Sequence, residues 1–540
     1  MKITLSINRT QYQSIEVSGD YLCLPIPARP EAGLLQIAFA LPIIDFHGFW
    51  IPENRVPSSK INWTIEANSA AQRHFPFLAF FNTAQQNRAS IAVTNLHDDC
   101  RITARMNQED CTYELTLEIC TSPETEPFEL IVDQRDQPWL SCLDDYRQRL
   151  ALPRQNFPAA AWEPVFCTWY AVHAAVTQDW VEKNAAVAAG LGCSTLIIDD
   201  GWCFAEMKRV SPETISSWYE NIGDWEVDEG KFPDFSAHVR RMQALGLKYL
   251  LWVSPLLIGD HSRIYPQIQA STDENYLEGY HLLNVTQRKE TALILEKVSA
   301  LMQKYPLDGL KIDFLDQFYP NLTNPRGRQT LDFIARLSAA IRKHNPDALL
   351  EFRQGYATPA MLPYATQFRA GDVPFDFLDN FQRLAQIRIA LGDGVPVHAD
   401  PAYWHPQERP ENIARHLIAS LAGVPMLSLE MTTLADHERA IISHWLQFYR
   451  EHLQTFKCGH WQVQYHHSAV SWVAVRTATE QIAIINDNAC LGEVLAGQET
   501  PLHILNLSPA VLSLPGCQAW GPAGDPAPAG SVPLGGRACC

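Results

Sequence analysis

The chain has 540 residues, of which 46% are hydrophobic and 19% are charged. These proportions are those of a folded globular protein and argue against disorder for most of the chain. Its 42 Lys and Arg against 60 Asp and Glu leave a net charge of −18, whereas nucleic-acid binding needs concentrated positive charge.

No apolar run reaches the roughly 18 residues of a membrane span, and the first residues lack the apolar core of a secretory signal. We therefore expect a soluble, cytoplasmic protein with no membrane or nucleic-acid partner. The 13 cysteines are scattered and form no Cys-x-x-Cys pair. This spacing predicts reduced thiols, with neither a disulfide framework nor a zinc ribbon.

A β-sandwich domain is predicted for residues 1–150. Apolar and polar residues alternate there with a period of two, so that Tyr113, Leu115 and Leu117 share one face and Glu114 lies on the other. Runs of this kind are separated by Asn, Asp, Pro and Gly. The pattern is typical of antiparallel sheets packed face to face.

Residues 151–454 alternate short apolar strands with amphipathic helices. Eight such strands predict a catalytic (β/α)8 TIM barrel, and a doubly wound parallel sheet is the alternative. The expected strands are 165–171, 195–199, 249–253, 309–314, 349–353, 367–370, 395–398 and 425–429. The clearest helical patterns are 179–189, 235–245, 328–343, 381–391 and 412–421.

A small C-terminal β domain is expected at residues 455–514. Short β-type runs return there at 473–475, 482–485 and 502–505. Residues 515–540 are rich in Pro, Gly and Ala, and this composition predicts a disordered tail.

Polar residues follow several of the predicted barrel strands at the ends where barrel active sites are built. They are Asp199, Asp200 and Trp202 after the second strand, Lys311 and Asp313 at the fourth, Arg353 at the fifth, Arg369 and Asp372 at the sixth, and His398 and Asp400 at the seventh. Several carboxylates at one mouth suit glycoside cleavage, in which one attacks the anomeric carbon and another protonates the leaving oxygen.

Each candidate also has an ordinary structural explanation. Asp-Asp-Gly is a common turn, and Asp372 is equally explained as a solvated loop carboxylate. A buried Asp313 is costly unless it is paired or functional, which favours a functional role. His398 and Asp400 have no third ligand at useful spacing, so we expect no metal site.

A series of short motifs runs in a fixed order through residues 162–430. They are a strand ending at Trp169, Leu-Ile-Ile-Asp-Asp-Gly-Trp at 196–202, Gly-Asp-Trp at 223–225, Lys-Phe-Pro-Asp at 231–234, and Lys-Ile-Asp at 311–313. In this order they resemble the melibiase-type α-galactosidases of glycoside hydrolase family 36, which form a clan with family 27. The resemblance implies a retaining hydrolase that removes terminal α-linked galactose from oligosaccharides without a metal or cofactor.

The resemblance also implies roles for individual residues. Asp313 matches the catalytic nucleophile, and Asp372 the general acid/base. Asp199 and Asp200 match residues that hold the sugar hydroxyls O4 and O6. The remaining matches are Lys311 at O3 or O4, Arg369 near O2, and Trp169, Trp202 and Trp225 as walls of the pocket. Members of the family are frequently oligomers, so a homo-oligomer is expected here.

The chain departs from the family pattern after the fifth strand. Glu-Phe-Arg-Gln-Gly at 351–355 replaces a Cys-Ser-x-Gly-Gly-Gly-Arg stretch that helps to read the C2 side of the sugar. Arg353 is therefore a further candidate substrate-binding residue, and the C2 preference stays open.

Three alternatives to a simple α-galactosidase follow from the same residues. One is a related galactosyltransferase or transglycosylase, and another is a hydrolase of a modified galactoside such as an α-N-acetylgalactosaminide. A non-catalytic sugar-binding relative is the third, although the presence of both Asp313 and Asp372 argues against it.

Overall fold

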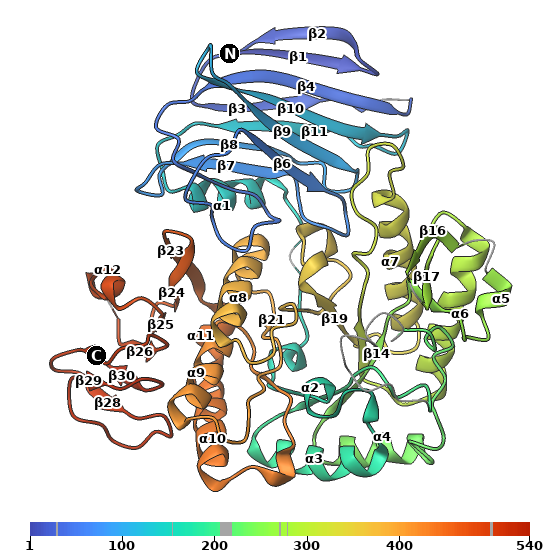
Figure 1. The fold of residues 1–540 in the computed structure, drawn as a ribbon, viewed down its shortest axis with the longest axis vertical. Coiled ribbons are helices and arrows are strands. Elements are labelled where there is room, and N and C mark those ends of the chain that lie inside the picture. The colour runs from blue at the N-terminus through green and yellow to red at the C-terminus, as the bar shows by residue number, and fades with distance from the viewer. Residues whose placement is uncertain (29–30, 154, 206–218, 269–271, 278, 497–499) are drawn as a thin grey trace.

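Two antiparallel sheets pack face to face in the N-terminal part of the chain (Figure 1). The computed structural model describes residues 1–540 apart from 29–30, 154, 206–218, 269–271, 278 and 497–499. The six-stranded sheet has the order β2-β1-β4-β10-β9-β6, and the five-stranded sheet the order β3-β11-β8-β7-β5. The strands are β1 (Lys2–Ile7), β2 (Thr10–Glu16), β3 (Tyr21–Ile26), β4 (Gly33–Pro42), β5 (Gly48–Trp50), β6 (Thr64–Ser69), β7 (Phe77–Phe81), β8 (Asn87–Val93), β9 (Cys100–Asn107), β10 (Thr112–Thr121) and β11 (Phe128–Asp133).

The alternation of β10 explains why these sheets stack. Tyr113, Leu115, Leu117 and Ile119 are buried between the sheets, because side chains two residues apart share one face of a strand. The predicted sandwich is confirmed.

Eight parallel strands follow and form the predicted barrel. In chain order they are β12 (Val165–Cys167), β13 (Thr195–Ile198), β14 (Lys248–Val253), β18 (Gly309–Ile312), β19 (Leu349–Arg353), β20 (Gln367–Arg369), β21 (Val397–His398) and β22 (Met426–Leu427). From β12 to β21, each strand pairs with the next barrel strand along the chain, and β12 also pairs with β22. Bridges from His398 to Val424 and from Ala402 to Leu427 join the seventh strand region to the eighth. Since the first and eighth strands pair, the sheet is a barrel and the doubly wound alternative is wrong.

Helices cover the outside of this barrel (Figure 1). The five predicted ones are α3 (Gln178–Leu191), α4 (Phe235–Ala244), α7 (Gly327–Arg342), α8 (Phe377–Leu391) and α9 (Pro410–Ser420). The structure adds α6 (Arg288–Lys304) and α10 (Asp436–Glu451), with the shorter α1 (Trp139–Arg149), α2 (Trp169–Val172), α5 (Tyr265–Ile268), α11 (Leu453–Cys458) and α12 (Leu491–Ala496). A small sheet of β15 (Leu257–Gly259), β16 (Thr272–Leu277) and β17 (Tyr280–Leu283) follows β14.

The first barrel strand is shorter than predicted. It ends at Cys167, and Trp169 begins α2 instead of continuing the strand to residue 171. The Thr168 hydroxyl accepts a hydrogen bond of 3.0 Å from the Asp199 N–H, which ties the end of this strand to its neighbour β13.

The last part of the chain is a β domain beside α8 and α9 (Figure 1). Its main sheet has the order β23-β24-β25-β26-β30-β28. The strands of this domain are β23 (His460–His466), β24 (Ala469–Arg476), β25 (Gln481–Ile485), β26 (Leu502–Asn506), β27 (Leu512–Ser513), β28 (Gln518–Trp520), β29 (Ser531–Val532) and β30 (Arg537–Cys539).

The prediction of a disordered tail at 515–540 is wrong. β30 pairs with β26 and completes the C-terminal sheet, and Val532 and Ala538 are fully buried. A disulfide joins Cys517 to Cys540. The Pro- and Gly-rich composition serves turns between short strands here, whereas the prediction had taken it for disorder. The expectation of reduced thiols fails for this pair and holds for the eleven other cysteines.

The sandwich and the barrel share one apolar core. Trp50, Phe75 and Trp139 of the N-terminal part belong to the same buried cluster as the barrel residues. The sandwich is therefore packed firmly against the barrel, beside the loops that follow β18 and β19. Within the described ranges, no helix combines the length and apolarity that crossing a membrane requires.

Candidate active site

The carboxyl ends of β13, β18, β19 and β20 bring most of the predicted site residues to one mouth of the barrel. Parallel strands end at the same rim, so residues far apart in sequence meet there. Asp199 and Lys311 illustrate this, because they are 112 residues apart and in direct contact.

Asp199 and Lys311 form a buried ion pair. Lys311 Nζ donates to Asp199 Oδ2 at 2.5 Å, and the Cys167 thiol contacts the same oxygen at 3.1 Å. Burial and Arg369 oppose the charge on Lys311, but Asp199, Cys167 and Asp313 together outweigh them and raise the pKa of the lysine. Lys311 is therefore charged, and its contact fixes Asp199 in one orientation.

Asp200 is buried beside Asp199 but has no comparable partner. Its side chain is almost fully buried, and within the described part of the chain neither carboxylate oxygen has a hydrogen-bond partner. Burial and the neighbouring Asp199 raise the pKa of Asp200 to about 8. A buried acceptor without a donor is costly, and such groups concentrate at binding sites.

Asp313 lies at the end of β18 with both oxygens held. Trp252 Nε1 donates to Oδ2 at 3.1 Å, and the Phe314 N–H donates to Oδ1 at 2.9 Å. Burial raises the pKa of Asp313, but Arg353, Lys311 and Arg369 together lower it below its ordinary value. The carboxylate is thus ionised and aimed, as a nucleophile requires. Phe314 has a φ of +58°, a strained conformation for a non-glycine residue that often marks functional sites.

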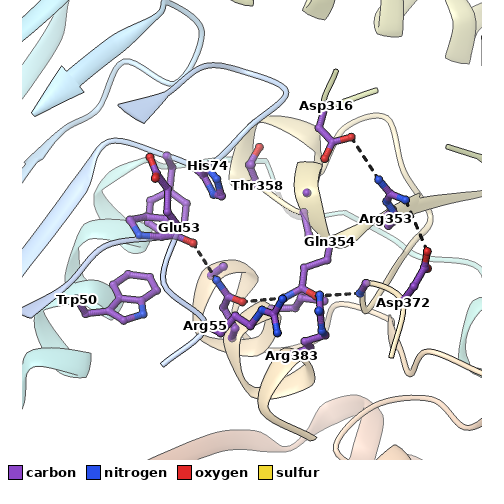
Figure 2. Close-up of a pocket in the computed structure, with 18 residues that line it drawn as sticks. Trp50, Glu53, Arg55, His74, Asp316, Arg353, Gln354, Thr358, Asp372 and Arg383 are labelled. Atoms are coloured by element: carbon purple, nitrogen blue, oxygen red, sulfur yellow. Dashed lines mark hydrogen bonds and ion pairs between the residues drawn. The ribbon is translucent and has the colours of Figure 1, made fainter. Parts of the chain in front are cut away.

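Arg353 stands between three carboxylates. Its Nε lies 3.3 Å from Asp313 Oδ1, its Nη2 3.8 Å from Asp316 Oδ1, and its Nη1 3.9 Å from Asp372 Oδ2. Figure 2 shows the guanidinium reaching toward Asp316 on one side and Asp372 on the other. One cation therefore links the predicted nucleophile to the predicted acid.

Asp372 is held by Arg369 and is the most exposed of these carboxylates. Arg369 Nη1 lies 2.9 Å from Asp372 Oδ1, while 48% of the Asp372 side chain is exposed. Desolvation raises the pKa of Asp372, but Arg369 and Arg353 outweigh it and lower the pKa to about 2. The carboxyl group is ionised in the unliganded protein.

Asp400 is the buried ion-pair partner of Arg369. Arg369 pairs with Asp400, whose other oxygen accepts hydrogen bonds from the Tyr170 hydroxyl at 2.7 Å and the Val373 N–H at 2.8 Å. Burial raises the pKa of Asp400 to about 7. His398 lies behind this group, with its Nδ1 3.1 Å from Glu351 Oε2. Both residues lie at the seventh strand, as expected from the sequence.

The three predicted tryptophans differ in exposure. Trp202 is fully buried and its Nε1 donates to Trp252 O at 2.9 Å, while Trp225 is nearly buried with its ring 5.9 Å from that of Trp252. Trp169 is half-buried, with its ring edge-on to His173 at 4.9 Å. Their role as walls of a sugar pocket stays a prediction.

A cavity of about 340 Å³ opens beside Arg353 and Asp372 (Figure 2). The barrel contributes these two residues together with Asp316, Gln354, Thr358 and Arg383, and the sandwich contributes Trp50, Glu53, Arg55 and His74. The cavity therefore lies on the Asp372 side of the mouth and between two domains.

Sequence reasoning missed Trp252 and Asp316 as site residues. Trp252 lies inside a predicted strand and was not singled out, although its indole holds Asp313. Asp316 follows Asp313 by three residues, and a second carboxylate just past a barrel strand was a usable signal. In the described chain, the His/Cys/Asp/Glu groups compact enough to hold a metal ion come from residues 452–503 and include none of the residues at this mouth.

A known protein family matches much of this barrel. The family model described as Melibiase matches residues 142–335, which include Asp199, Asp200 and Asp313. Over these residues the chain is similar to the melibiase family.

The curated relatives that this chain resembles are named α-galactosidases. The bifunctional α-galactosidase/sucrose kinase AgaSK of Mediterraneibacter gnavus is 25% identical over 315 residues, which are 54% of this chain and 30% of the relative. The α-galactosidase AgaA of Geobacillus stearothermophilus is 23% identical over 335 residues, 57% of this chain and 43% of the relative. The chain spans less than half the length of these two relatives.

Solved structures share the whole fold. The family 36 α-galactosidase AgaA superimposes with a TM-score of 0.64 at 16% identity, covering 88% of this chain and 72% of that one. The galactosidase domain of AgaSK gives a TM-score of 0.62 at 15% identity, covering 99% of this chain and 80% of that one. The predicted fold, a barrel flanked by two β domains, is confirmed.

Proposed function

We propose that this chain is a retaining glycoside hydrolase that removes terminal α-linked galactose from oligosaccharides. The observation that carries the proposal is the pair of carboxylates with opposite surroundings. Asp313 is buried, hydrogen-bonded and ionised, and Asp372 is exposed toward a cavity. Two carboxyl groups with separate tasks are what glycoside hydrolysis needs.

The first chemical step uses both groups. Asp313 attacks the anomeric carbon, the bond from that carbon to the leaving oxygen breaks, and Asp372 gives its proton to that oxygen. Because Asp372 is ionised in the unliganded site, it takes up this proton as substrate binds and loosens its contact with Arg353. In the second step Asp372 takes a proton from water, which attacks the anomeric carbon and releases Asp313.

Asp199 and Asp200 are the proposed readers of the galactose hydroxyls. Asp200 offers two buried acceptors without donors, and hydroxyl donors from a sugar satisfy them. Lys311 holds Asp199 and offers donors to a neighbouring hydroxyl. The half-buried Trp169 is the proposed apolar wall.

The relatives support galactose as the sugar. The curated relatives are named α-galactosidases, and structures of variants of the Geobacillus enzyme are described as complexes with raffinose and with stachyose. The second candidate is hydrolysis of a modified galactoside. The stretch at 351–355 differs from the family pattern that helps to read the C2 side of the sugar, and its Arg353 lies beside both Asp313 and Asp372.

The experiment is a substrate panel followed by product analysis. The protein should cleave p-nitrophenyl α-galactoside and raffinose, and it should leave the matching α-glucoside intact. NMR of the first product should show the α anomer of galactose, because two displacements restore the configuration. Cleavage of p-nitrophenyl α-N-acetylgalactosaminide in preference to the galactoside would move the assignment to the second candidate. A β anomer as first product contradicts the retaining mechanism, and transfer to added raffinose in place of water indicates the transferase alternative.

A further inference from the structure

The sandwich reaches the barrel mouth through a turn at residues 70–73. Gln72 of this turn is fully buried, and its Nε2 donates to Phe318 O at 2.9 Å. On the other side of the turn, Thr358 Oγ1 donates to Ala71 O at 3.0 Å. The turn is therefore bonded both to the loop after β18 and to the loop after β19.

Arg73 makes the contact of this turn that lies closest to the catalytic groups. Its Nη1 donates to Asp316 O at 2.8 Å and lies 3.8 Å from Asp316 Oδ2. The guanidinium also stacks on the Tyr319 ring, 3.7 Å from its centre. Arg73 thereby holds both the backbone and the carboxylate of Asp316.

The other oxygen of Asp316 faces Arg353. Asp316 Oδ1 is buried, has no hydrogen-bond partner among the described residues, and lies 3.8 Å from Arg353 Nη2. The loop after β19 leaves room for the Asp316 carboxylate only because residue 355 is glycine. A Cβ at Gly355 would lie 1.8 Å from Asp316 Oδ2. The site is thus shaped around Asp316.

We propose that Arg73 and Asp316 are positioning residues, through which the sandwich holds the Arg353 guanidinium between the nucleophile Asp313 and the acid Asp372. The chain of contacts runs from Arg73 to Asp316 and from Asp316 to Arg353. Of these three residues, Arg353 is the one that contacts the carboxylates of Asp313 and Asp372. This inference rests on the proposed function for its catalytic meaning, while the contacts themselves are testable without activity.

Loss of this hold has a defined electrostatic consequence. Arg353, Lys311 and Arg369 favour the ionised form of Asp313, whereas Asp372 and Asp200 disfavour it. Arg353 is the strongest of these cations. When Arg353 becomes free to move away, the pKa of Asp313 rises, because an opposite charge stabilises an ionised carboxylate most at short range.

The kinetic test uses Arg73→Gln and Asp316→Asn in the full chain. The acid side of the pH profile of kcat/KM for p-nitrophenyl α-galactoside should move to higher pH by up to about one unit in both variants. The value at the optimum should fall about ten-fold. Arg73→Lys keeps the charge and should restore part of the wild-type profile. Arg328→Gln is the matched control, because it breaks a second ion pair between the same domains. In that pair Arg328 Nη2 lies 3.0 Å from Asp98 Oδ2, and the contacts described above do not connect it to Arg353.

A second measurement needs no turnover. In the described structure Arg73 and Arg353 both contact Asp316, through which they are joined. In urea unfolding, the double variant Arg73→Gln/Arg353→Gln should therefore lose less stability than the two single variants added together, whereas Arg328→Gln/Arg353→Gln should be additive. Additive losses for Arg73 and Arg353, or an acid limb that moves as much in Arg328→Gln as in Arg73→Gln, would overturn the inference. If the wild type fails to cleave any α-galactoside, the proposed function is wrong. The unfolding measurements still decide whether Arg73 acts on Arg353 through Asp316.

Discussion

Asp199 and Asp200 are neighbours in the chain, yet their carboxylates are in different chemical states. Asp199 is paired with Lys311, whereas Asp200 is buried without a donor and has its pKa raised from 3.8 to about 8. Identical residues thus differ because Lys311, two strands away in the sheet, forms an ion pair with Asp199. Lys231, by contrast, acts on Asp200 too weakly to offset its burial. A buried group that is poorly satisfied in the free protein is available to a ligand.

Asp200→Asn should stabilise the free protein and weaken catalysis. The folded-state pKa lies above the unfolded value, so the folded chain holds an extra proton between about pH 4 and 8. The contribution of Asp200 to stability therefore falls as pH rises through that window. The variant should raise the thermal midpoint at pH 8 and change it little at pH 4. Because the amide cannot lose a proton to accept hydrogen bonds from the sugar hydroxyls as a carboxylate, kcat/KM should fall by about 30- to 1000-fold.

Asp110→Asn, in the exposed turn after β9, is the control for both measurements. Its midpoint and kcat/KM should match those of the wild type. An Asp200→Asn protein that is destabilised at pH 8 contradicts the assignment of an unsatisfied buried charge.

Asp372→Ala should separate substrates by their leaving groups. Raffinose needs protonation of its leaving oxygen, whereas p-nitrophenolate leaves without help. The loss in kcat/KM should therefore be on the order of 10²–10⁴-fold for raffinose and small for the p-nitrophenyl galactoside. Asp313→Ala should instead reduce both by about 10³-fold or more. Equal losses with the two substrates in Asp372→Ala would remove the residue from the acid role.

At the scale of elements, helix α7 receives its N-terminal cap from another domain. Asp99 of the sandwich accepts hydrogen bonds from the N–H groups of Gly327 at 2.8 Å, Arg326 at 3.1 Å and Asn321 at 2.9 Å. The residue before the helix, Arg326, makes no side-chain cap of its own. The first N–H groups of a helix have no partner within it, so a carboxylate from outside satisfies them and favours the helix dipole.

Asp99→Ala should therefore lower the free energy of unfolding by about 1–3 kcal/mol. Asp99→Asn should cost less, because the amide oxygen still accepts from one or two of these donors. Urea unfolding measures both, and Glu66→Ala on the exposed face of β6 is the control with an expected change below about 0.5 kcal/mol. A cost for Asp99→Ala no larger than that of the control would show that the cap contributes nothing.

At the scale of the whole molecule, the end of the described chain closes the C-terminal domain. β30 lies between β26 and β28 in the sheet. The disulfide from Cys517 to Cys540 joins the two ends of the segment that contains β28, β29 and β30. Without this segment, β26 would be an edge strand and its buried side chains would be exposed.

Cys540→Ser should lower the stability of the C-terminal domain by about 3 kcal/mol under oxidising conditions. Under reducing conditions the variant and the wild type should unfold together, because neither then has the cross-link. Cys111→Ser, at an exposed free cysteine, should match the wild type in both conditions. A wild type whose thermal midpoint does not respond to a reducing agent argues against the disulfide.

The periodicity of the sequence determined the two larger domains. Seven of the barrel strands lie within two residues of their predicted bounds, and the first ends four residues early, because a run of apolar residues and the polar residues that end it are local features. Asp199, Lys311 and Asp313 follow from the same rule, since a barrel gathers the residues at its strand ends. The composition of 515–540 misled for a physical reason: Pro and Gly are common both to disorder and to tight turns, and only pairing with β26 distinguishes them.

The partners of those residues were decided by the tertiary structure alone. Arg73 meets Asp316 across 243 positions, and Asp99 meets Gly327 across 228. Neither contact leaves a periodic trace in the sequence, because it depends on how two separately folded domains pack. The state of each carboxylate depends in turn on such contacts: a charge three or four ångströms away and the loss of water decide whether an Asp is a buried acceptor, a nucleophile or an acid.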